Sequence, residues 1–323
     1  MSGLQALLRP ARSPGTGPRL DWRKYVLYIG FAVLFVVFAA TLSDEGFTSS
    51  NNLLNIIRQT ATISVMAVAV TFVIGAAEID LSVGAVAGLA SVICAMALDA
   101  YGLIPGIVAG VLLGATVGAI NGTLVVAVGI PSFLVTLGML GIAHGSAQWI
   151  TDSAPQPILD DTFNNLFGTG DLGPIPSLVI WTAVAVAIGH ILLRHTSYGR
   201  GVLATGGNEE AARFSGVPTR RIKFTVMMVS SVVAAIAGMM YAGRLQSGRF
   251  QWGEGDELSV IAAVILGGTS LFGGRASVIG ALLGSLMIGL INNGLILMGL
   301  EFSQQQIIRG IIIILAVALA TRD

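Results

Sequence analysis

The sequence predicts an all-α integral membrane protein with about ten transmembrane helices. Hydrophobic residues make up 54% of the chain, charged residues 11%, and the mean hydropathy is +0.84. A water-soluble domain would expose large apolar patches at that composition. Apolar runs of about 17 to 20 residues recur along the chain, the length with which a helix crosses roughly 30 Å of hydrocarbon. The alternating pattern of barrel strands is absent, so helices must satisfy the backbone within the membrane.

Ten spans account for nearly all of these apolar runs. They are Tyr25 to Leu42, Ala61 to Ala77, Leu81 to Leu98, Leu103 to Ala127, Ser132 to Ile150, Leu178 to Leu193, Phe224 to Tyr241, Leu258 to Phe272, Ala276 to Met298 and Gln304 to Ala320. The eighth span is short and rich in glycine, which predicts a broken or re-entrant helix. Residues 1–24 carry five basic side chains among Pro and Gly and are expected to form a cytoplasmic tail.

The distribution of basic residues sets the expected orientation, because Lys and Arg concentrate in cytoplasmic loops. With the tail inside, thirteen basic residues fall on the cytoplasmic side. Five lie in the tail, seven are the basic residues of 194–223 counted together with Arg275, and the last is Arg322. Only Arg58, Arg244, Arg249 and Arg309 fall on or near the outer side. Both termini are therefore expected in the cytoplasm. The long outer loop 151–177 agrees, since it carries four aspartates and no basic residue.

An internal repeat divides the chain into residues 25–177 and 178–323. Asp80-Leu81-Ser82-Val83 resembles Glu257-Leu258-Ser259-Val260, and the glycine pattern from Gly110 to Gly122 resembles that from Gly280 to Gly294. The matching spans are the third with the eighth and the fourth with the ninth, so the second copy is upside down. This predicts an inverted five-plus-five repeat, a transporter architecture. The alternative is that small residues recur only because they pack membrane helices.

The chain shows no energy-converting chemistry of its own. Its only lysines are Lys24 and Lys223, and neither follows the glycine pattern of a phosphate-binding loop. The spans contain few ionisable groups of the kind a proton- or ion-driven carrier needs; His144 is the main one, and a structural role is favoured. Glu78 and Asp80 lie at a span boundary, where capping of the following helix is favoured over substrate binding.

Composition excludes two further classes. The formal net charge is zero, so nothing indicates nucleic-acid binding. Cys94 is the only cysteine, which excludes an intramolecular disulfide and a multi-cysteine metal site, and its apolar surroundings favour packing. No cofactor and no metal is expected.

Residues 194–223 form the one extended polar and basic segment between spans. Within it, Asn208, Glu209 and Glu210 favour a helix start, and Gly216 with Pro218 favours its end. A short helix with small residues such as Ala211 fits a groove on another protein, and neighbouring arginines can pair with acidic side chains there. The alternative is an ordinary cytoplasmic loop that obeys the positive-inside rule.

Motifs along nearly the whole chain resemble the permease family of bacterial ABC importers for ribose and related sugars, which is also related to the branched-chain amino-acid permeases. The motifs are Phe47 with Asn52 and Leu53 to Gln59, Glu78 to Gly84, Asn121-Gly122, Gly129 to Phe133 with Thr136 to Gly138, Gly206 to Gly216, Leu266 to Ser270 with Gly273-Gly274, and Asn292 to Gly294. Each motif is weak alone, and the set is specific.

The resemblance implies a type II ABC importer-like fold in the bacterial inner membrane. It implies a second permease copy (a homodimer, or a pairing with a close relative), a cytoplasmic ABC ATPase that hydrolyses the ATP, and a periplasmic sugar-binding protein. The loop carrying Asn208, Glu209, Glu210, Ala211, Ala212, Arg213 and Gly216 then matches the coupling helix that docks on the ATPase. The residues after Gly216 depart from the fuller pattern of other importers, so roles beyond docking are not carried over.

Two further sets of residues have two interpretations each. Asn121, Asn292 and Asn293 are candidates for lining a sugar pathway, because amides exchange hydrogen bonds with hydroxyls, but bonding between helices is at least as well supported. The outer arginines, with Glu254, Asp256 and Glu257, are candidates for docking the binding protein by charge complementarity, although a plain solvated loop is favoured.

The cargo is expected to be a monosaccharide, a ribose-like pentose or a hexose. The same machinery importing a branched-chain amino acid, a nucleoside or a small furanose signal remains an alternative. A stand-alone secondary carrier is the alternative from another class, and a membrane scaffold without transport is a third. The chain itself does not identify the solute, because in such importers selection rests largely with the binding protein.

Overall fold

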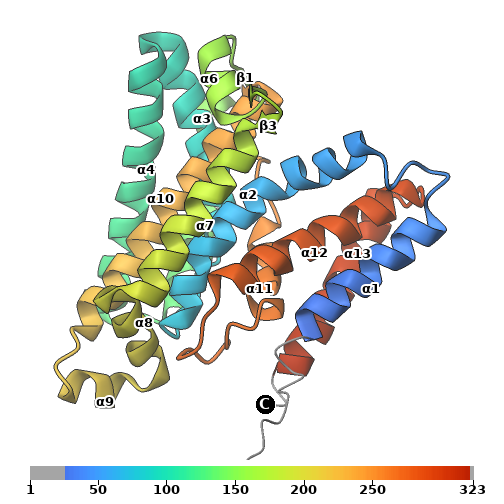
Figure 1. Cartoon of the computed structure of the whole chain (residues 1–323). Helices are drawn as coiled ribbons and strands as arrows, with labels where there is room; N and C mark the ends of the chain where they lie inside the picture. The colour runs from blue at the N-terminus through green and yellow to red at the C-terminus, as the bar shows by residue number, and fades with distance from the viewer. Residues whose placement is uncertain (1–25, 321–323) are drawn as a thin grey trace, which may run out of the picture.

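The protein is almost entirely helical in a computed structural model that describes residues 26–320 (Figure 1). The predicted tail 1–24 and Arg322 lie outside these residues. The helices are α1 (Val26–Thr41), α2 (Ser50–Gly75), α3 (Val83–Tyr101), α4 (Leu103–Thr123) with a π-helical turn (Leu124–Val128), α5 (Ser132–Thr151), α6 (Asp161–Phe167), α7 (Ser177–His195), α8 (Ser197–Gly207), α9 (Glu209–Phe214), α10 (Thr219–Leu245), α11 (Asp256–Leu266), α12 (Val278–Leu297) and α13 (Phe302–Ala320).

Four two-residue strands form two small antiparallel pairs. β1 (Gln156–Pro157) pairs with β4 (Ser247–Gly248), and β2 (Asp171–Leu172) pairs with β3 (Ile175–Pro176). With α6 they build the cap at one end of the molecule, opposite the end that carries α8 and α9 (Figure 1). The start of α1 and the end of α13 lie toward the α8–α9 end in the same view.

Seven helices of the described chain are long and apolar enough to cross a membrane. They are α2, α3, α4 with its π-helical turn, α5, α7, α10 and α12. The other three predicted spans fall on α1, α11 and α13, which do not meet the same criterion within the described residues. The protein is therefore a multi-pass helical membrane protein, and seven crossings follow from helix length and composition.

The eighth predicted span differs from the helix found there. The prediction runs from Leu258 to Phe272, whereas α11 has 11 residues and ends at Leu266. Two glycine pairs follow, and Gly268, Gly273 and Gly274 adopt positive φ angles. Side chains disfavour that conformation, so these glycines let the chain leave the helix and turn toward α12. This end of α11 agrees with the expectation of a broken helix.

Two compact groups of helices form the interior. In the first, α4 packs closely on α10 and α3: an added Cβ at Gly114 would lie 2.7 Å from the Ser231 carbonyl oxygen. In the second, α12 packs on α2 and α11, and an added Cβ at Gly284 would lie 2.1 Å from the Ala263 carbonyl oxygen. The glycines of both repeated motifs thus bring helix backbones together, as small residues do in membranes.

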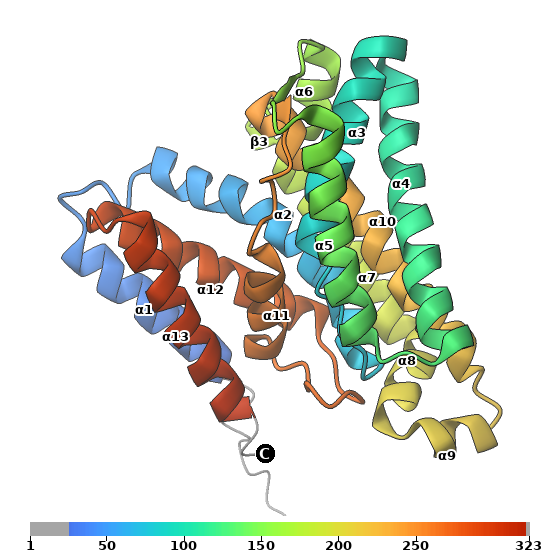
Figure 2. The same cartoon turned by 180° about the vertical axis from the view of Figure 1, so that it is seen from behind.

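Helix α2 connects these two groups. It is buried along most of its length, and it runs obliquely from the α1–α12 side to the α7–α8 side (Figures 1 and 2). Ser64 on α2 and Ser285 on α12 share a buried hydrogen bond of 2.7 Å. A displacement of the α2 end next to α8 would therefore move helices of both groups.

Candidate functional site

The segment between α7 and α10 folds into two short helices with capped starts. The Thr196 hydroxyl accepts a hydrogen bond from the Gly199 N–H at the start of α8. The Asn208 side-chain oxygen accepts one from the Ala211 N–H, at 2.9 Å, at the start of α9. Gly216 has a φ of +83°, which lets the chain turn back after α9. The helix that the sequence predicts in this segment is therefore present, with the expected cap and end.

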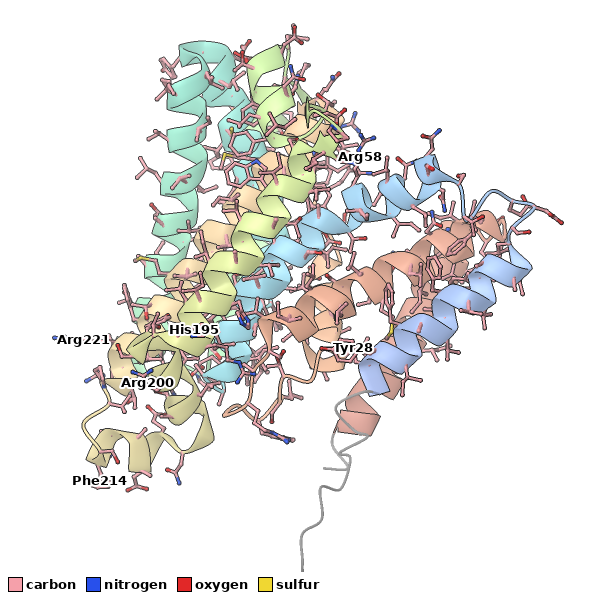
Figure 3. The ribbon with its side chains drawn as sticks, viewed as in Figure 1. Tyr28, Arg58, His195, Arg200, Phe214 and Arg221 are labelled. Atoms are coloured by element: carbon pink, nitrogen blue, oxygen red, sulfur yellow. The ribbon has the colours of Figure 1, made fainter. Side chains whose placement is uncertain are left out.

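Helix α9 presents one face away from the rest of the chain. Ala212 is buried, whereas Glu210, Ala211 and Arg213 are exposed. Phe214 is 80% exposed and points outward at the edge of the molecule (Figure 3), and the Arg213 guanidinium lies 5.8 Å from the centre of its ring. An exposed aromatic side chain beside acidic and small residues is suited to binding another protein. Sequence reasoning did not single out Phe214, although an aromatic residue in a polar cytoplasmic segment was a usable signal.

Helix α8 lies directly on the ends of other elements. An added Cβ at Gly206 would lie 2.0 Å from the Gly75 carbonyl oxygen at the end of α2. That carbonyl accepts a hydrogen bond of 3.1 Å from the Gly274 N–H in the loop before α12. The Arg194 guanidinium donates to the Ala276 carbonyl, at 3.3 Å, in the same loop. The backbones of α8, α2 and this loop are therefore in direct contact, and α8 has little space to move relative to the end of α2.

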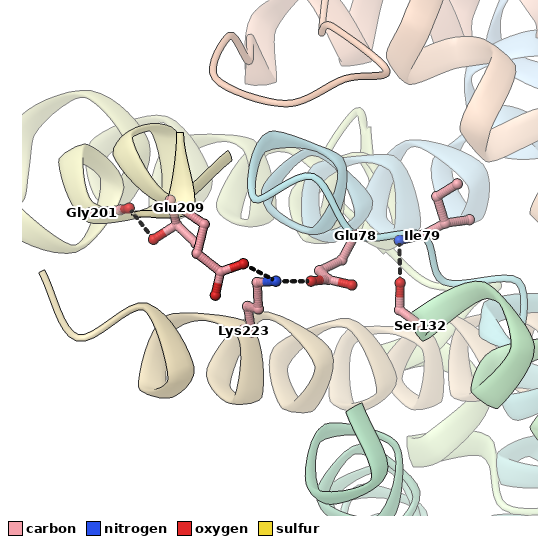
Figure 4. Close-up of polar contacts among 7 residues, drawn as sticks. Glu78, Ile79, Ser132, Gly201, Glu209 and Lys223 are labelled. Atoms are coloured by element: carbon pink, nitrogen blue, oxygen red, sulfur yellow. Dashed lines mark hydrogen bonds and ion pairs between the residues drawn. The ribbon is translucent and has the colours of Figure 1, made fainter. Parts of the chain in front are cut away.

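Lys223 ties α9 to the transmembrane core. Its ammonium group lies 2.7 Å from the Glu209 carboxylate, on the first residue of α9, and 2.7 Å from the Glu78 carboxylate, which comes after α2 (Figure 4). Glu78 is buried, and about half of the Glu209 side chain is exposed. One ammonium carries three donors and can serve both carboxylates. It therefore links α9, the start of α10 and the segment between α2 and α3.

The two acidic residues at this boundary do not cap α3 as the sequence indicated. Glu78 forms the ion pair with Lys223 instead. Asp80 accepts hydrogen bonds from the Ser82 N–H and hydroxyl just before α3, and from the Ser230 hydroxyl on α10, at 2.7 Å. Burial explains the difference, because a buried carboxylate needs partners on neighbouring helices. Lys223 was also missed as a partner; a lone lysine at a span start, with an acid at another span boundary, was the available signal.

The segment between α2 and α3 also holds the start of α5. The Ile79 N–H donates to the Ser132 hydroxyl, at 3.0 Å (Figure 4). The Leu81 N–H donates to the Thr136 hydroxyl, also at 3.0 Å. The contacts run from exposed α9 through Lys223 and Glu78 to α2, α3 and α5. This arrangement is mechanical rather than catalytic: it connects a surface that a partner can reach with helices that cross the membrane.

The three candidate asparagines have different surroundings. Asn121 is fully buried and donates to the Ser82 hydroxyl, at 3.2 Å. Asn293 on α12 exchanges two amide hydrogen bonds with Asn52 on α2, at 2.8 and 3.0 Å. Asn292 is half-buried, and within the described chain its side chain makes no hydrogen bond. Two of the three thus join helices, and Asn292 has an amide available to another group.

The candidate outer residues do not form one free surface. Arg58 pairs with Asp171, at 3.2 Å, and the Arg249 guanidinium lies 5.5 Å from the Trp252 ring centre. Asp256 is buried and accepts a hydrogen bond from the Tyr241 hydroxyl. The side chains that remain exposed there include Glu254, Arg58 and Asp171.

The remaining residues named from the sequence lie in packing positions. His144 stands edge-on to the Phe250 ring, with 5.3 Å between ring centres. Cys94 is buried, and burial in apolar surroundings suits a packing role.

Comparison with known proteins identifies the family of this chain. A family model described as the branched-chain amino acid transport system / permease component matches residues 52–317. The chain is 40% identical over 293 residues to the probable ABC transporter permease protein YphD of Escherichia coli K12, covering 90% of this chain and 87% of that protein. It is 38% identical over 294 residues to the ribose import permease protein RbsC of Bacillus subtilis, covering 90% and 91%.

A third relative extends the similarity to almost the whole sequence. The L-arabinose ABC transporter permease protein AraH of Azospirillum brasilense is 36% identical over 314 residues, covering 97% of this chain and 91% of that protein. No solved structure matches the chain. The chain is a multi-pass membrane protein of the transporter permease class. It belongs to the ABC permease family to which these relatives belong, whose members are transport subunits and not enzymes.

Proposed function

We propose that this protein is the membrane-spanning permease subunit of an ATP-driven importer for a monosaccharide, a ribose-like pentose or a hexose. The main observation behind this proposal is that exposed α9 is joined through Lys223 to the segment between α2 and α3, in a chain of the ABC permease family. The names of the relatives, which include ribose and L-arabinose permeases, support the sugar class over an amino acid, a nucleoside or a furanose signal.

In this proposal α9 docks on a cytoplasmic ABC ATPase. Glu210, Ala211 and Arg213 face the ATPase, Phe214 enters an apolar pocket on it, and Asn208 and Gly216 fix the ends of the helix. When ATP draws two ATPase domains together, α9 moves with them. Lys223 passes that movement to Glu78 and the segment before α3, and packed helices then rock as rigid rods.

We further propose ten crossings arranged as an inverted five-plus-five repeat. The packing supports it: α4 lies against α3 and α10, whereas α12 lies against α11 and α2. An offset of five spans relates α3 to α11, α4 to α12 and α2 to α10. The group of α3, α4 and α10 therefore corresponds to the group of α11, α12 and α2, with each half contributing one helix, α10 or α2, to the group of the other half. The α8–α9 end is then cytoplasmic, together with both termini.

The pathway is proposed to form with a second permease copy, in a homodimer or with a close relative. A periplasmic sugar-binding protein docks at the opposite end, at the cap of α6 and the short strands, where Glu254 and the Arg58–Asp171 pair are exposed. Among the three candidate asparagines, Asn292 is favoured for contact with solute hydroxyls, because Asn121 is fully buried and the amide of Asn293 is hydrogen-bonded to Asn52.

The docking role is tested by reversing the chemistry of the exposed face of α9. Glu210→Arg and Ala211→Arg are expected to abolish binding-protein-stimulated uptake in membrane vesicles while the permease inserts at normal levels. Ala204→Arg is the matched control, since Ala204 is an exposed alanine of α8 outside the proposed docking face. Normal uptake by both α9 variants would show that the coupling assignment is wrong.

A further inference from the structure

The outer face of α7 borders an apolar groove that the coupling and transport roles do not use. The groove has a volume of about 450 Å³ and lies between α7, α2 and α12. On α7 it is lined by Val179, Ala183, Ala187 and His190, and on α12 by Ile279 and Leu282. Most of the residues that line it are apolar, and Thr182 and His190 are the exceptions.

The groove runs along most of α7, and only its part next to His190 lies toward the α8–α9 end. Its lining on α7 extends from Val179 to His190, which is roughly 16 Å at 1.5 Å per residue. Val184, Ile188 and Ile191 on the neighbouring face of α7 are exposed, as residues that meet lipid are. An acyl chain that enters from the α8–α9 end therefore meets the part of the groove next to His190, and the chemistry of that part suits it.

Basic side chains gather where the groove reaches the α8–α9 end. His190 lines the groove, and its ring centre lies 5.9 Å from that of His195. Arg194 is one helical turn beyond His190, a spacing that makes neighbours on a helix. Its guanidinium uses one nitrogen on the Ala276 carbonyl, next to the start of α12. A guanidinium carries five N–H donors, so others remain for an anion.

Negative charge is missing from the same region. The sequence contains no Asp or Glu between residues 172 and 208 or between 258 and 300, the stretches that hold α7, α8, most of α11 and α12. Glu209, the next acid along the chain, and Glu78, which follows α2, are both paired with Lys223. The end of the groove thus offers positive charge and imidazole hydrogen-bonding groups without a competing carboxylate.

We propose that this groove binds an anionic phospholipid from the leaflet on the α8–α9 side. One acyl chain lies along α7 against Ile279 and Leu282, and the phosphate contacts Arg194, with His190 and His195 available as further partners. The groove and the basic cluster are continuous, which favours a molecule with an apolar chain and an anionic head over a second protein copy. The bound lipid would stabilise the α7 end where α8 begins.

The test is native mass spectrometry of the purified full-length permease. Delipidated protein is titrated with dioleoyl-phosphatidylglycerol or with dioleoyl-phosphatidylcholine, which has the same acyl chains and no net charge. Wild-type protein is expected to bind phosphatidylglycerol about ten-fold more tightly. Arg194→Gln combined with His195→Gln should remove that preference. Arg213→Gln, which removes one charge from α9 farther along the same loop, should keep it.

A second variant tests the groove itself. Ala187→Trp places a large side chain on an exposed position of the lining, and it is expected to weaken binding of both lipids without unfolding the protein. Equal binding of the two lipids by wild-type protein, or unchanged lipid binding by Ala187→Trp, would overturn the proposal. Loss of the dimer in Ala187→Trp, with lipid binding intact, would instead assign the groove to a second copy.

Discussion

Lys223 and Glu209 join the start of a transmembrane helix to the first residue of exposed α9, with 2.7 Å between ammonium and carboxylate. The same ammonium reaches the buried carboxylate of Glu78. This two-way contact provides a physical route from α9 to the membrane-embedded part of the protein, and it can be separated experimentally into a stabilising half and a coupling half.

The stabilising half is the Lys223–Glu78 pair. Lys223→Met leaves the carboxylate of Glu78, whose side chain is 8% exposed, without its cation. Removing one partner of a buried pair costs about 3 kcal/mol, so thermal unfolding in detergent should shift clearly downward. The double variant Lys223→Met with Glu78→Gln should recover much of the loss. A single variant as stable as wild type would contradict the assigned pair.

The coupling half is the Lys223–Glu209 pair. Because 47% of the Glu209 side chain is exposed, Glu209→Gln should change the free energy of unfolding by less than about 1 kcal/mol. Uptake in vesicles with the ATPase and binding protein present should nevertheless fall by about five-fold or more. Arg200→Gln, which removes an exposed charge from neighbouring α8, should leave uptake near normal. Equal uptake by both variants would argue against transmission through Lys223.

The junction between α8 and α2 predicts different outcomes at two adjacent glycines. Gly206→Ala would place its Cβ 2.0 Å from the Gly75 carbonyl oxygen, so the backbones must separate and folded yield should drop. Gly207→Ala should be tolerated, since the nearest atom to an added Cβ lies at 3.7 Å. Detergent-stable yield and thermal unfolding measure both. Similar behaviour of the two variants would be inconsistent with this junction.

Substitution of the two neighbouring asparagines on α12 should also have different effects on stability. Asn293→Ala removes both amide hydrogen bonds to Asn52 and should lower stability by about 1 to 3 kcal/mol, seen as a lower unfolding temperature. Asn292→Ala breaks no hydrogen bond within the described chain, so its unfolding temperature should stay near wild type. If Asn292 contacts the solute, uptake should fall in that variant. A destabilised Asn292→Ala would instead show a packing role.

Much of the helical framework was predictable because the membrane imposes long apolar runs. The spans on α2, α3, α4, α5, α7, α10 and α12 each correspond to a helix able to cross. The sequence also predicted α9, because Asn208 and Gly216 have local effects on helix ends that do not depend on tertiary contacts. The end of α11 was misplaced because hydrophobicity continues beyond its glycines, where backbone conformation decides.

The partners of polar groups were much less predictable. Glu78 was expected to act on the next helix, and its actual partner lies on α10, far along the chain. Asn293 likewise finds Asn52 across the molecule. Such choices depend on which helices meet, and a single sequence does not encode that in any local pattern. Phe214 was overlooked for a different reason: exposure of an aromatic side chain is visible only once α9 is placed at the edge of the molecule.

The central claim is that this chain provides a passage and receives its energy through α9. The direct test is solute accumulation in liposomes containing the purified permease, first alone under imposed proton or sodium gradients, then with its ATPase, binding protein and ATP. We expect concentrative uptake only in the second case. Concentrative uptake by the permease alone would contradict the account and identify a self-sufficient carrier.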